Sequence, residues 1–174
     1  MDSSATIGRR DIYAAGAYLR GAFTVYDKVQ RIAITPQAGM ARIGGSQMPK
    51  QLQQFEVTAW HNGPDDKPGT GDDLSLGTVP VTWRVEEYTV TFEDDDVRFV
   101  GTLDQSGLFT PAVDGPNPAR PGNRNNVGDV WVVATWTPPG GGTPLRARAH
   151  LLVTVPLYMR WDPGNASTAG RPVP

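Results

Sequence analysis

The chain of 174 residues contains no cysteine and only two histidines. Without a thiol it has no disulfide, no thiolate nucleophile, no cysteine-ligated zinc and no Cys-x-x-Cys-His attachment for a c-type haem. No apolar run approaches the roughly 18 residues that a membrane-spanning helix needs. The first 25 residues also lack the charged, apolar and small-residue layout of a secretory signal peptide. These absences predict a soluble chain and leave its compartment open.

Basic clusters are missing as well. The formal net charge is −2, and no block of five or more Lys or Arg residues occurs. A sequence-independent surface for phosphate groups is therefore not indicated, and nucleic acid is a poor candidate partner. With 39% hydrophobic residues, the chain is long enough to bury one core of ordinary size.

What the chain has in quantity is glycine and proline, 20 and 16 residues, spread as pairs and turns between short alternating segments. No helical period separates these segments. About seven strands at this spacing predict an all-β fold, an immunoglobulin-like antiparallel β-sandwich. The clearest predicted strands are Phe23 to Thr35, Gln54 to Trp60, Val79 to Val85, Val130 to Trp136 and Arg146 to Val155.

Several positions refine this prediction. Pro36 cannot donate to a β-ladder, so the first edge strand should end before it. Trp83 alternates with Val81 and Val85, and we expect it to be the central aromatic of the core. The strand from Val130 to Trp136 is apolar on both faces, which is typical of a central strand.

The domain organisation follows from these segments. We expect a lead-in arm over residues 1–22, the sandwich over 23–156 and an extended C-terminal tail over 157–174. Aromatic residues of the two arms have no obvious place in a single sandwich and are candidates for binding a protein partner. They are Tyr13, Tyr18, Phe23, Tyr26, Tyr158 and Trp161.

Catalytic patterns are weak. His61 and His150 alternate within strands with no nucleophile elbow nearby, so they are expected to be surface residues. The adjacent Glu86 and Glu87 should point to opposite faces of a strand. The acids from Asp94 to Asp96 are typical of a solvated turn.

A segment rich in aspartate follows the second predicted strand. Its oxygen-bearing side chains lie among glycines that allow the backbone to fold back, as a Ca²⁺ site requires. The spacing is not that of an EF-hand, and the alternative is an acidic turn whose carboxylates accept hydrogen bonds from backbone amides. The candidate ligands are Asn62, Asp65, Asp66, Asp72 and Asp73.

The segment from Asp114 to Asp129 is a second candidate site. It has no hydrophobic period and is rich in Pro, Gly and Asn. Two interpretations stay open: a preorganised docking surface, or a loop packed on itself through Asn and Asp hydrogen bonds.

Several segments together resemble one family, the C-terminal immunoglobulin-like domain of the alpha subunit of quinohemoprotein amine dehydrogenase. The resemblance extends in order over residues 23–161, and its most specific blocks are Asn62-Gly63-Pro64-Asp65 and Gly115-Pro116-Asn117-Pro118. Further matching stretches are 25–29, 34–36, 41–44, 55–73, 107–111, 125–129, 153–155 and 160–161.

The resemblance implies a periplasmic enzyme whose alpha subunit carries a dihaem cytochrome domain, while a small subunit carries a cysteine-derived quinone. Neither group carries over to this chain, which lacks cysteine. The immunoglobulin-like domains of that family are scaffold. The chain begins at Met1 with its own arm, which suggests a free-standing paralogue or a separate subunit.

Three functions follow in order of preference. The first is a non-catalytic accessory subunit that assembles with other proteins of an amine dehydrogenase-like redox complex, without a cofactor of its own beyond a possible Ca²⁺. The second is an independent binding module for a carbohydrate or cell-surface ligand, which Trp60, Trp131 and Trp161 would favour if exposed on one face. An enzyme is a distant third.

Overall fold

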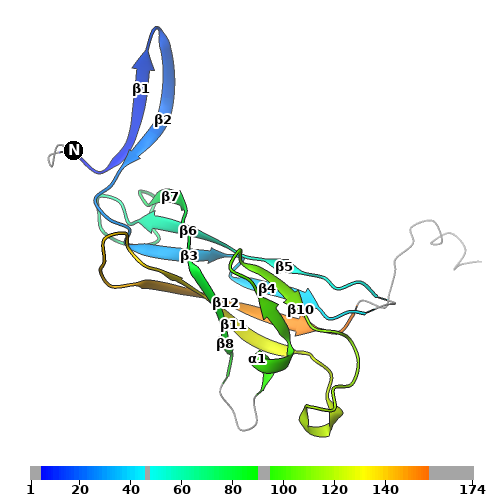
Figure 1. The fold of residues 1–174 in the computed structure, drawn as a ribbon. Coiled ribbons are helices and arrows are strands. Elements are labelled where there is room, and N and C mark those ends of the chain that lie inside the picture. Colours follow the sequence, from blue (N-terminus) through cyan, green and yellow to red (C-terminus); the bar gives the residue numbers. More distant parts are fainter. Residues whose placement is uncertain (1–4, 46–47, 90–94, 157–174) are drawn as a thin grey trace, which may run out of the picture.

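The computed structural model describes residues 5–45, 48–89 and 95–156 (Figure 1). Strands dominate these residues, and two of their sheets form the layers of a sandwich. The three-stranded layer has the order β3 (Arg31–Thr35), β6 (Glu56–His61) and β7 (Leu74–Thr78). The four-stranded layer has the order β4 (Ala38–Arg42), β12 (Leu145–Thr154), β11 (Gly128–Trp136) and β8 (Thr82–Glu87). The predicted all-β sandwich is confirmed.

Shorter elements complete the sandwich. A small sheet has the order β5 (Gln53–Gln54), β10 (Leu108–Pro111) and β9 (Gly101–Leu103). The helix α1 (Asp96–Phe99) precedes β9, and the 3-10 helix η1 (Pro121–Asn123) lies in the segment before β11. Among the described residues, no helix has the length and apolar character required to cross a membrane.

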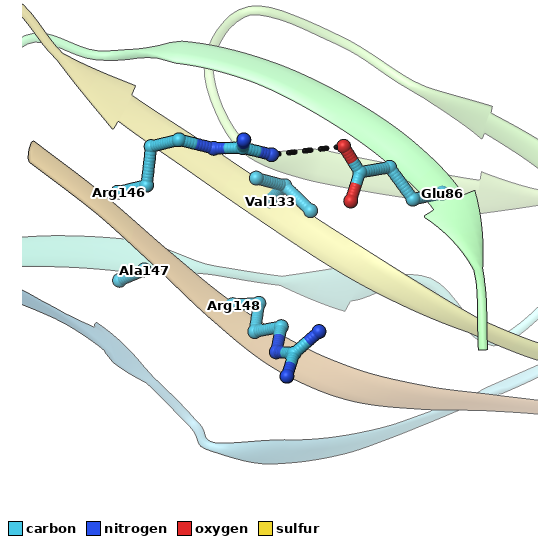
Figure 2. Close-up of a pocket in the computed structure, with 5 residues that line it drawn as sticks. All are labelled: Glu86, Val133, Arg146, Ala147 and Arg148. Atoms are coloured by element: carbon cyan, nitrogen blue, oxygen red, sulfur yellow. Dashed lines mark hydrogen bonds and ion pairs between the residues drawn. The ribbon is translucent and has the colours of Figure 1, made fainter. Parts of the chain in front are cut away.

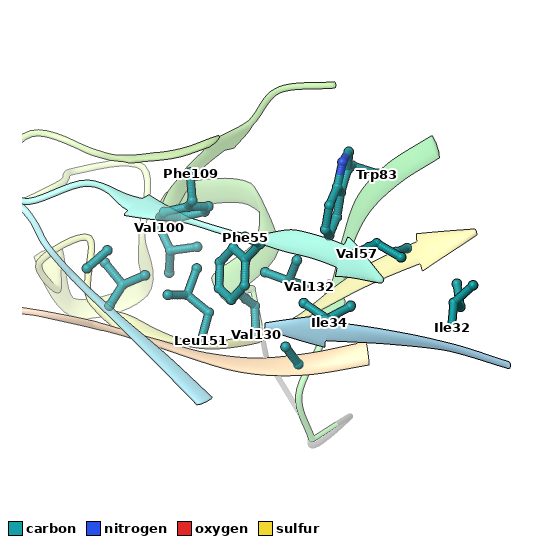
Figure 3. Packing of buried hydrophobic residues seen from close by; sticks show 14 of the residues in the cluster. Ile32, Ile34, Phe55, Val57, Trp83, Val100, Phe109, Val130, Val132 and Leu151 are labelled. Carbon is teal, nitrogen blue, oxygen red and sulfur yellow. The ribbon is translucent and has the colours of Figure 1, made fainter. Parts of the chain in front are cut away.

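The core lies between the two layers (Figure 3). Strand alternation directs Ile34 and Val57 inward from one layer and Val132 and Leu151 inward from the other, and all four are buried. Phe55 fills the space between them. Each side chain of this size contributes about 1.5–3 kcal/mol when it is fully buried.

Trp83 belongs to this core, as predicted. The turn before β10 contains Gly107 at φ 82°, the positive angle that its place in the turn predicts. A Cβ at this position would collide with the carbonyl oxygen of Phe55 and come within 3.0 Å of the Trp83 ring. The turn is therefore packed directly on the core.

The chain changes layer between β3 and β4. β3 ends at Thr35, as the position of Pro36 predicts, and the Thr35–Pro36 peptide is cis. β4 then pairs with β12, and the two strands run parallel. The prediction of a purely antiparallel sandwich is wrong for this pair, because β4 joins the sheet beside the last strand and runs in its direction.

The predicted strand from Phe23 to Thr35 is also wrong as a single element. β2 ends at Val25 and β3 begins at Arg31. Between them, Asp27 turns towards His61 on β6 and forms a hydrogen bond with it. The alternation of Val25, Val29 and Ile32 gave no signal for this interruption.

The N-terminal arm is a β-hairpin of β1 (Gly8–Ala14) and β2 (Ala17–Val25) that stands away from the sandwich (Figure 1). The expected boundary after residue 22 falls inside β2. Ala15 and Gly16 connect the strands with φ of 49° and 82°, as a two-residue type I′ turn requires. The strands bury little against the rest of the chain, so the hairpin is a separate structural region.

Candidate interaction surface

The hairpin presents large apolar side chains on both of its faces. Ile12 pairs with Leu19 and Tyr13 pairs with Tyr18 across the two strands. Since directly opposed residues share a face and neighbours alternate, the tyrosine pair and the aliphatic pair lie on opposite faces. Tyr13 is 74% exposed, Leu19 62% and Tyr18 61%. Both faces of the hairpin therefore expose apolar side chains.

Polar contacts fix the irregular stretch of β2. The register shifts opposite Asp11, whose carboxylate accepts a hydrogen bond from the Gly21 amide at 2.6 Å and another from the Tyr18 hydroxyl. The Tyr18 hydroxyl, followed by the Gly21 amide, lowers the pKa of Asp11. The same hydrogen bond raises the pKa of Tyr18. The carboxylate thus holds the tyrosine ring in place on its face.

The hairpin is basic in an otherwise acidic chain. Arg9, Arg10 and Arg20 carry three positive charges against the single carboxylate of Asp11. The whole chain has a net charge of −2. A partner surface that is acidic and apolar would complement this hairpin.

A buried histidine anchors the segment after the hairpin. His61 is 3% exposed, so the prediction of a surface histidine is wrong. Its Nδ1 accepts a hydrogen bond from the Gly63 amide at 3.0 Å, and its Nε2 lies 3.0 Å from Asp27 Oδ1. Because Nδ1 is an acceptor, Nε2 carries the proton and donates to Asp27. Burial acts to raise the pKa of Asp27, but the hydrogen bonds from His61 and from backbone amides lower it overall.

Phe23 and Tyr26, the other candidate aromatics of this region, are 49% and 48% exposed. Phe23 pairs with Arg10 on the aliphatic face of the hairpin, and Tyr26 follows β2 directly. Tyr158 and Trp161 lie outside the described residues. Partner binding by all six aromatics stays a prediction.

In the aspartate-rich segment, carboxylates accept hydrogen bonds from backbone amides. Asp65 accepts from the Lys67 amide at 2.9 Å, and Asp72 accepts from the Thr70 hydroxyl at 2.6 Å and the Asp65 amide at 3.2 Å. The Thr70 hydroxyl is the main cause of the lowered pKa of Asp72.

The remaining members of this segment bond to other parts of the chain. Asp73 forms an ion pair with Arg31 at 2.6 Å, Asn62 accepts from the same guanidinium at 3.1 Å, and Asp66 accepts from Gln30. Within the described residues, no group of three or more acidic, His or Cys side chains is arranged to hold a metal ion. This geometry favours the alternative of an acidic turn, and Ca²⁺ binding stays a prediction.

The segment from Asp114 to Asp129 is packed on itself around Arg120, which is 3% exposed. The guanidinium donates to the carbonyls of Asn125 and Val127, both at 2.9 Å. It also pairs with Asp95 at 2.7 Å and Asp96 at 2.6 Å.

Burial acts to lower the pKa of Arg120, but hydrogen bonds with Asp96 and Asp95 raise it overall. Amide contacts such as Asn117 to Asn126, at 2.8 Å, support the same segment. Of the two open interpretations, the structure favours the self-packed loop. The role of Arg120 had no signal in the sequence, because its partners lie 24 and 25 residues away.

A family model for domain IV of the alpha subunit of quinohemoprotein amine dehydrogenase matches residues 32–165. The chain belongs to this family. The resemblance inferred from the Asn-Gly-Pro-Asp and Gly-Pro-Asn-Pro blocks is confirmed. A search of curated proteins found no match.

The extent of the domain IV match separates the two regions of the molecule. It begins at Ile32, within β3, and runs through the sandwich. The β1–β2 hairpin, over Gly8 to Val25, lies outside the matched residues. The family match therefore covers the sandwich and not the exposed aromatic hairpin.

The tryptophans of the domain IV sandwich do not form one surface. Trp60 lies on β6 between the inward residues Ala59 and His61, so it faces outward from the three-stranded layer. Trp131 lies on β11 between the buried Val130 and Val132, so it faces outward from the four-stranded layer. The shared face that would favour a carbohydrate module is not formed by these two residues, and Trp161 is outside the described residues.

Proposed function

We propose that this chain is a non-catalytic structural subunit or domain that mediates protein–protein assembly in a quinohemoprotein amine dehydrogenase-like redox complex. The observation that carries the proposal is the exposed aromatic hairpin attached to a domain IV sandwich. The family membership supports a complex of this type, and it also supports a periplasmic location.

The energetics of the hairpin support a protein partner. A lone two-stranded hairpin is marginally stable in water, because it has no second layer against which to bury its side chains. Tyr13 and Leu19, on opposite faces, are both more than half exposed. Covering one face would remove apolar surface from water and order the hairpin at the same time.

The non-catalytic part of the proposal follows from the chemistry of this chain. The family's redox groups, a c-type haem and a cysteine-derived quinone, both need cysteine, and the chain has none. Its two histidines both pair with aspartates, His61 with Asp27 and His150 with Asp129 at 3.1 Å. The complex would therefore obtain its redox chemistry from other chains.

Co-expression with the haem-bearing and quinone-bearing amine dehydrogenase subunits of the same organism tests the proposal. The tagged chain should co-elute with haem absorbance in size-exclusion chromatography. The double substitution Tyr13→Ser and Leu19→Ser should abolish this co-elution, because it removes an apolar side chain from each face of the hairpin.

Leu52→Ser is the matched control, since Leu52 is an exposed apolar residue outside the hairpin. It should leave co-elution unchanged. A wild-type chain that elutes alone and free of haem would overturn the proposal. Amine oxidation by the purified chain without other subunits would overturn its non-catalytic part.

A further inference from the structure

Three arginines and two aromatic rings lie on the outer face of the four-stranded layer. They are Arg84, Arg146, Arg148, Tyr88 and Trp131. Val133 on β11 pairs with Arg84 on β8 and with Arg148 on β12, so these three side chains form one row. Trp131 pairs with Glu86 and His150 in the next row. Because neighbours on a strand alternate, both rows face away from the core.

A groove of about 470 Å³ lies on this face. Its lining residues are Glu86, Val133, Arg146, Ala147 and Arg148 (Figure 2). Glu86 is the only acid among them, and one of its oxygens accepts from both Arg84 and Arg146. The Arg84 Nε lies 2.6 Å and the Arg146 guanidinium 3.0 Å from Glu86 Oε1. The Glu86 carboxylate thus accepts hydrogen bonds from two arginines.

Arg148 has no share in this ion pairing. Its guanidinium carbon lies 4.5 Å from the centre of the Trp131 ring. Among the described residues, none accepts a hydrogen bond from Arg148 or pairs with it as an acid. Figure 2 shows its guanidinium directed away from the Arg146–Glu86 pair. Its N–H groups are therefore available to a ligand.

The ring beneath Arg148 is itself held in place. The Trp131 indole donates to the Tyr88 carbonyl at 3.1 Å, and the two rings lie 4.7 Å apart. The centres of the His150 and Tyr88 rings lie 4.1 Å apart, and His150 Nε2 lies 3.1 Å from Asp129 Oδ2. A guanidinium stacked on a fixed indole loses less side-chain freedom when it binds, so its donors are preorganised.

We propose that this groove binds an extended acidic segment of another polypeptide, with Arg148 as the donor to a carboxylate. The planar guanidinium matches a carboxylate through two parallel hydrogen bonds. Among the lining residues, Arg146 and Arg148 against Glu86 leave a net positive charge, in a chain whose net charge is −2. The charge of the groove is therefore complementary to acidic side chains.

The geometry favours a polypeptide over a small anion. Arg84 and Arg148 lie on strands that flank β11, and two strand spacings correspond to about 10 Å. In a polyproline II segment, which has three residues per turn and a rise of about 3.1 Å per residue, carboxylates three residues apart lie on one face about 9 Å apart. Glu86 lies inside the groove and disfavours a multiply charged phosphate. This surface is separate from the hairpin, so the proposal does not rest on the assembly function.

The probe is a capped peptide with two glutamates, Glu-Gly-Gly-Glu, titrated into the ¹⁵N-labelled full chain. The Trp131 indole N–H and the Arg148 Nε–H resonances should shift together. Arg148→Gln should weaken binding at least about ten-fold, the loss expected for one charge-assisted hydrogen bond. Trp131→Leu should also weaken it, although the charge is unchanged.

Arg98→Gln is the matched control, because Arg98 is an exposed arginine that stacks on Phe99 at 5.2 Å, on α1. It should change binding less than two-fold. The peptide Gln-Gly-Gly-Gln should not bind. Absence of shifts with the acidic peptide overturns the proposal. Equal binding of glutarate, inorganic phosphate or phosphatidylglycerol vesicles would also overturn it, in favour of a small carboxylate, a phosphate site or a lipid surface.

Discussion

The β1–β2 hairpin and the sandwich use the same antiparallel pairing, but they bury their side chains very differently. In the sandwich, each strand places one face against a second layer, and Phe55 is 1% exposed. In the hairpin, Tyr13 is 74% exposed, although its strand is also paired with a neighbour. Backbone hydrogen bonds therefore define a strand in both regions, while burial decides which region is stable on its own.

The same contrast coincides with the family boundary. The sandwich from β3 onward matches domain IV, whereas the hairpin precedes the match. The matched region is thus the one that contains the buried core, and the hairpin outside the match exposes its apolar side chains. The following experiments test this contrast, beginning with the largest expected effect.

Phe55→Ala and Phe23→Ala compare the two regions directly. Phe55 is fully enclosed, so its loss should lower the free energy of unfolding by about 3–5 kcal/mol. Phe23 is 49% exposed on the hairpin, and its loss should change stability by less than about 0.5 kcal/mol. Urea unfolding followed by tryptophan fluorescence measures both. Equal losses would contradict the separation of the two regions.

Arg120→Ala tests a polar part of the sandwich. Its removal leaves the partly buried carboxylates of Asp95 and Asp96 without their shared cation, and should cost about 3 kcal/mol. Arg124, half exposed and 3.4 Å from Asp95, supplies the control. Arg124→Ala should cost less than about 0.5 kcal/mol. If both variants melted like the parent chain in calorimetry, the loop would not depend on Arg120.

Deletion of residues 1–25 removes the hairpin and keeps the Asp27–His61 pair. The remaining sandwich should unfold with a stability within about 0.5 kcal/mol of the full chain, because the deleted residues bury little against it. Thermal melting by circular dichroism measures the change. A drop of several degrees would show that the hairpin supports the core.

The smallest effect concerns two exposed carboxylates. Hydrogen bonds from Ser106 and then Leu108 lower the pKa of Asp104 in the sandwich, and Tyr18 and Gly21 lower that of Asp11 in the hairpin. A carboxyl group whose pKa is lower in the folded chain than in the unfolded chain stabilises the fold at pH values above its unfolded pKa, about 3.9. This contribution is lost as the pH falls through the lower pKa of the folded chain.

Asp104→Asn should therefore weaken the dependence of the free energy of unfolding on pH in the acid range. Asp11→Asn should leave that dependence unchanged. The Gly21 amide resonance should instead report protonation of Asp11 as a local event. A change in global acid stability caused by Asp11→Asn would contradict the independence of the hairpin.

Short sequence patterns predicted the structural features that depend on residues close together in the chain. The alternation of Val130 to Trp136 identified a central strand, and Trp83 was identified as a core residue. Pro36 marked the end of β3, since a missing donor acts at its own position. The family resemblance followed from short blocks of turn residues that require specific backbone angles.

Features that depend on distant contacts were not predictable in this way. The buried Arg120 needs acids more than 20 residues away, and Arg148 stacks on Trp131 only because β11 and β12 pair in one register. The Ala15-Gly16 turn lacks the Asn-Gly or Asp-Gly pattern that predicts a hairpin. The parallel β4–β12 pair had no local signal, because the two strands are far apart in the chain.

The position of β12 has a consequence for biosynthesis. Among the described residues, this strand, Leu145–Thr154, is the last of the sandwich in sequence, but it lies between β4 and β11 in the four-stranded layer. β4 has no other neighbour in that layer. A growing polypeptide therefore cannot complete the sheet in order of synthesis, and β4 must wait with an open edge until β12 has left the ribosome. Closure of this sandwich is an event that follows translation of its final strand.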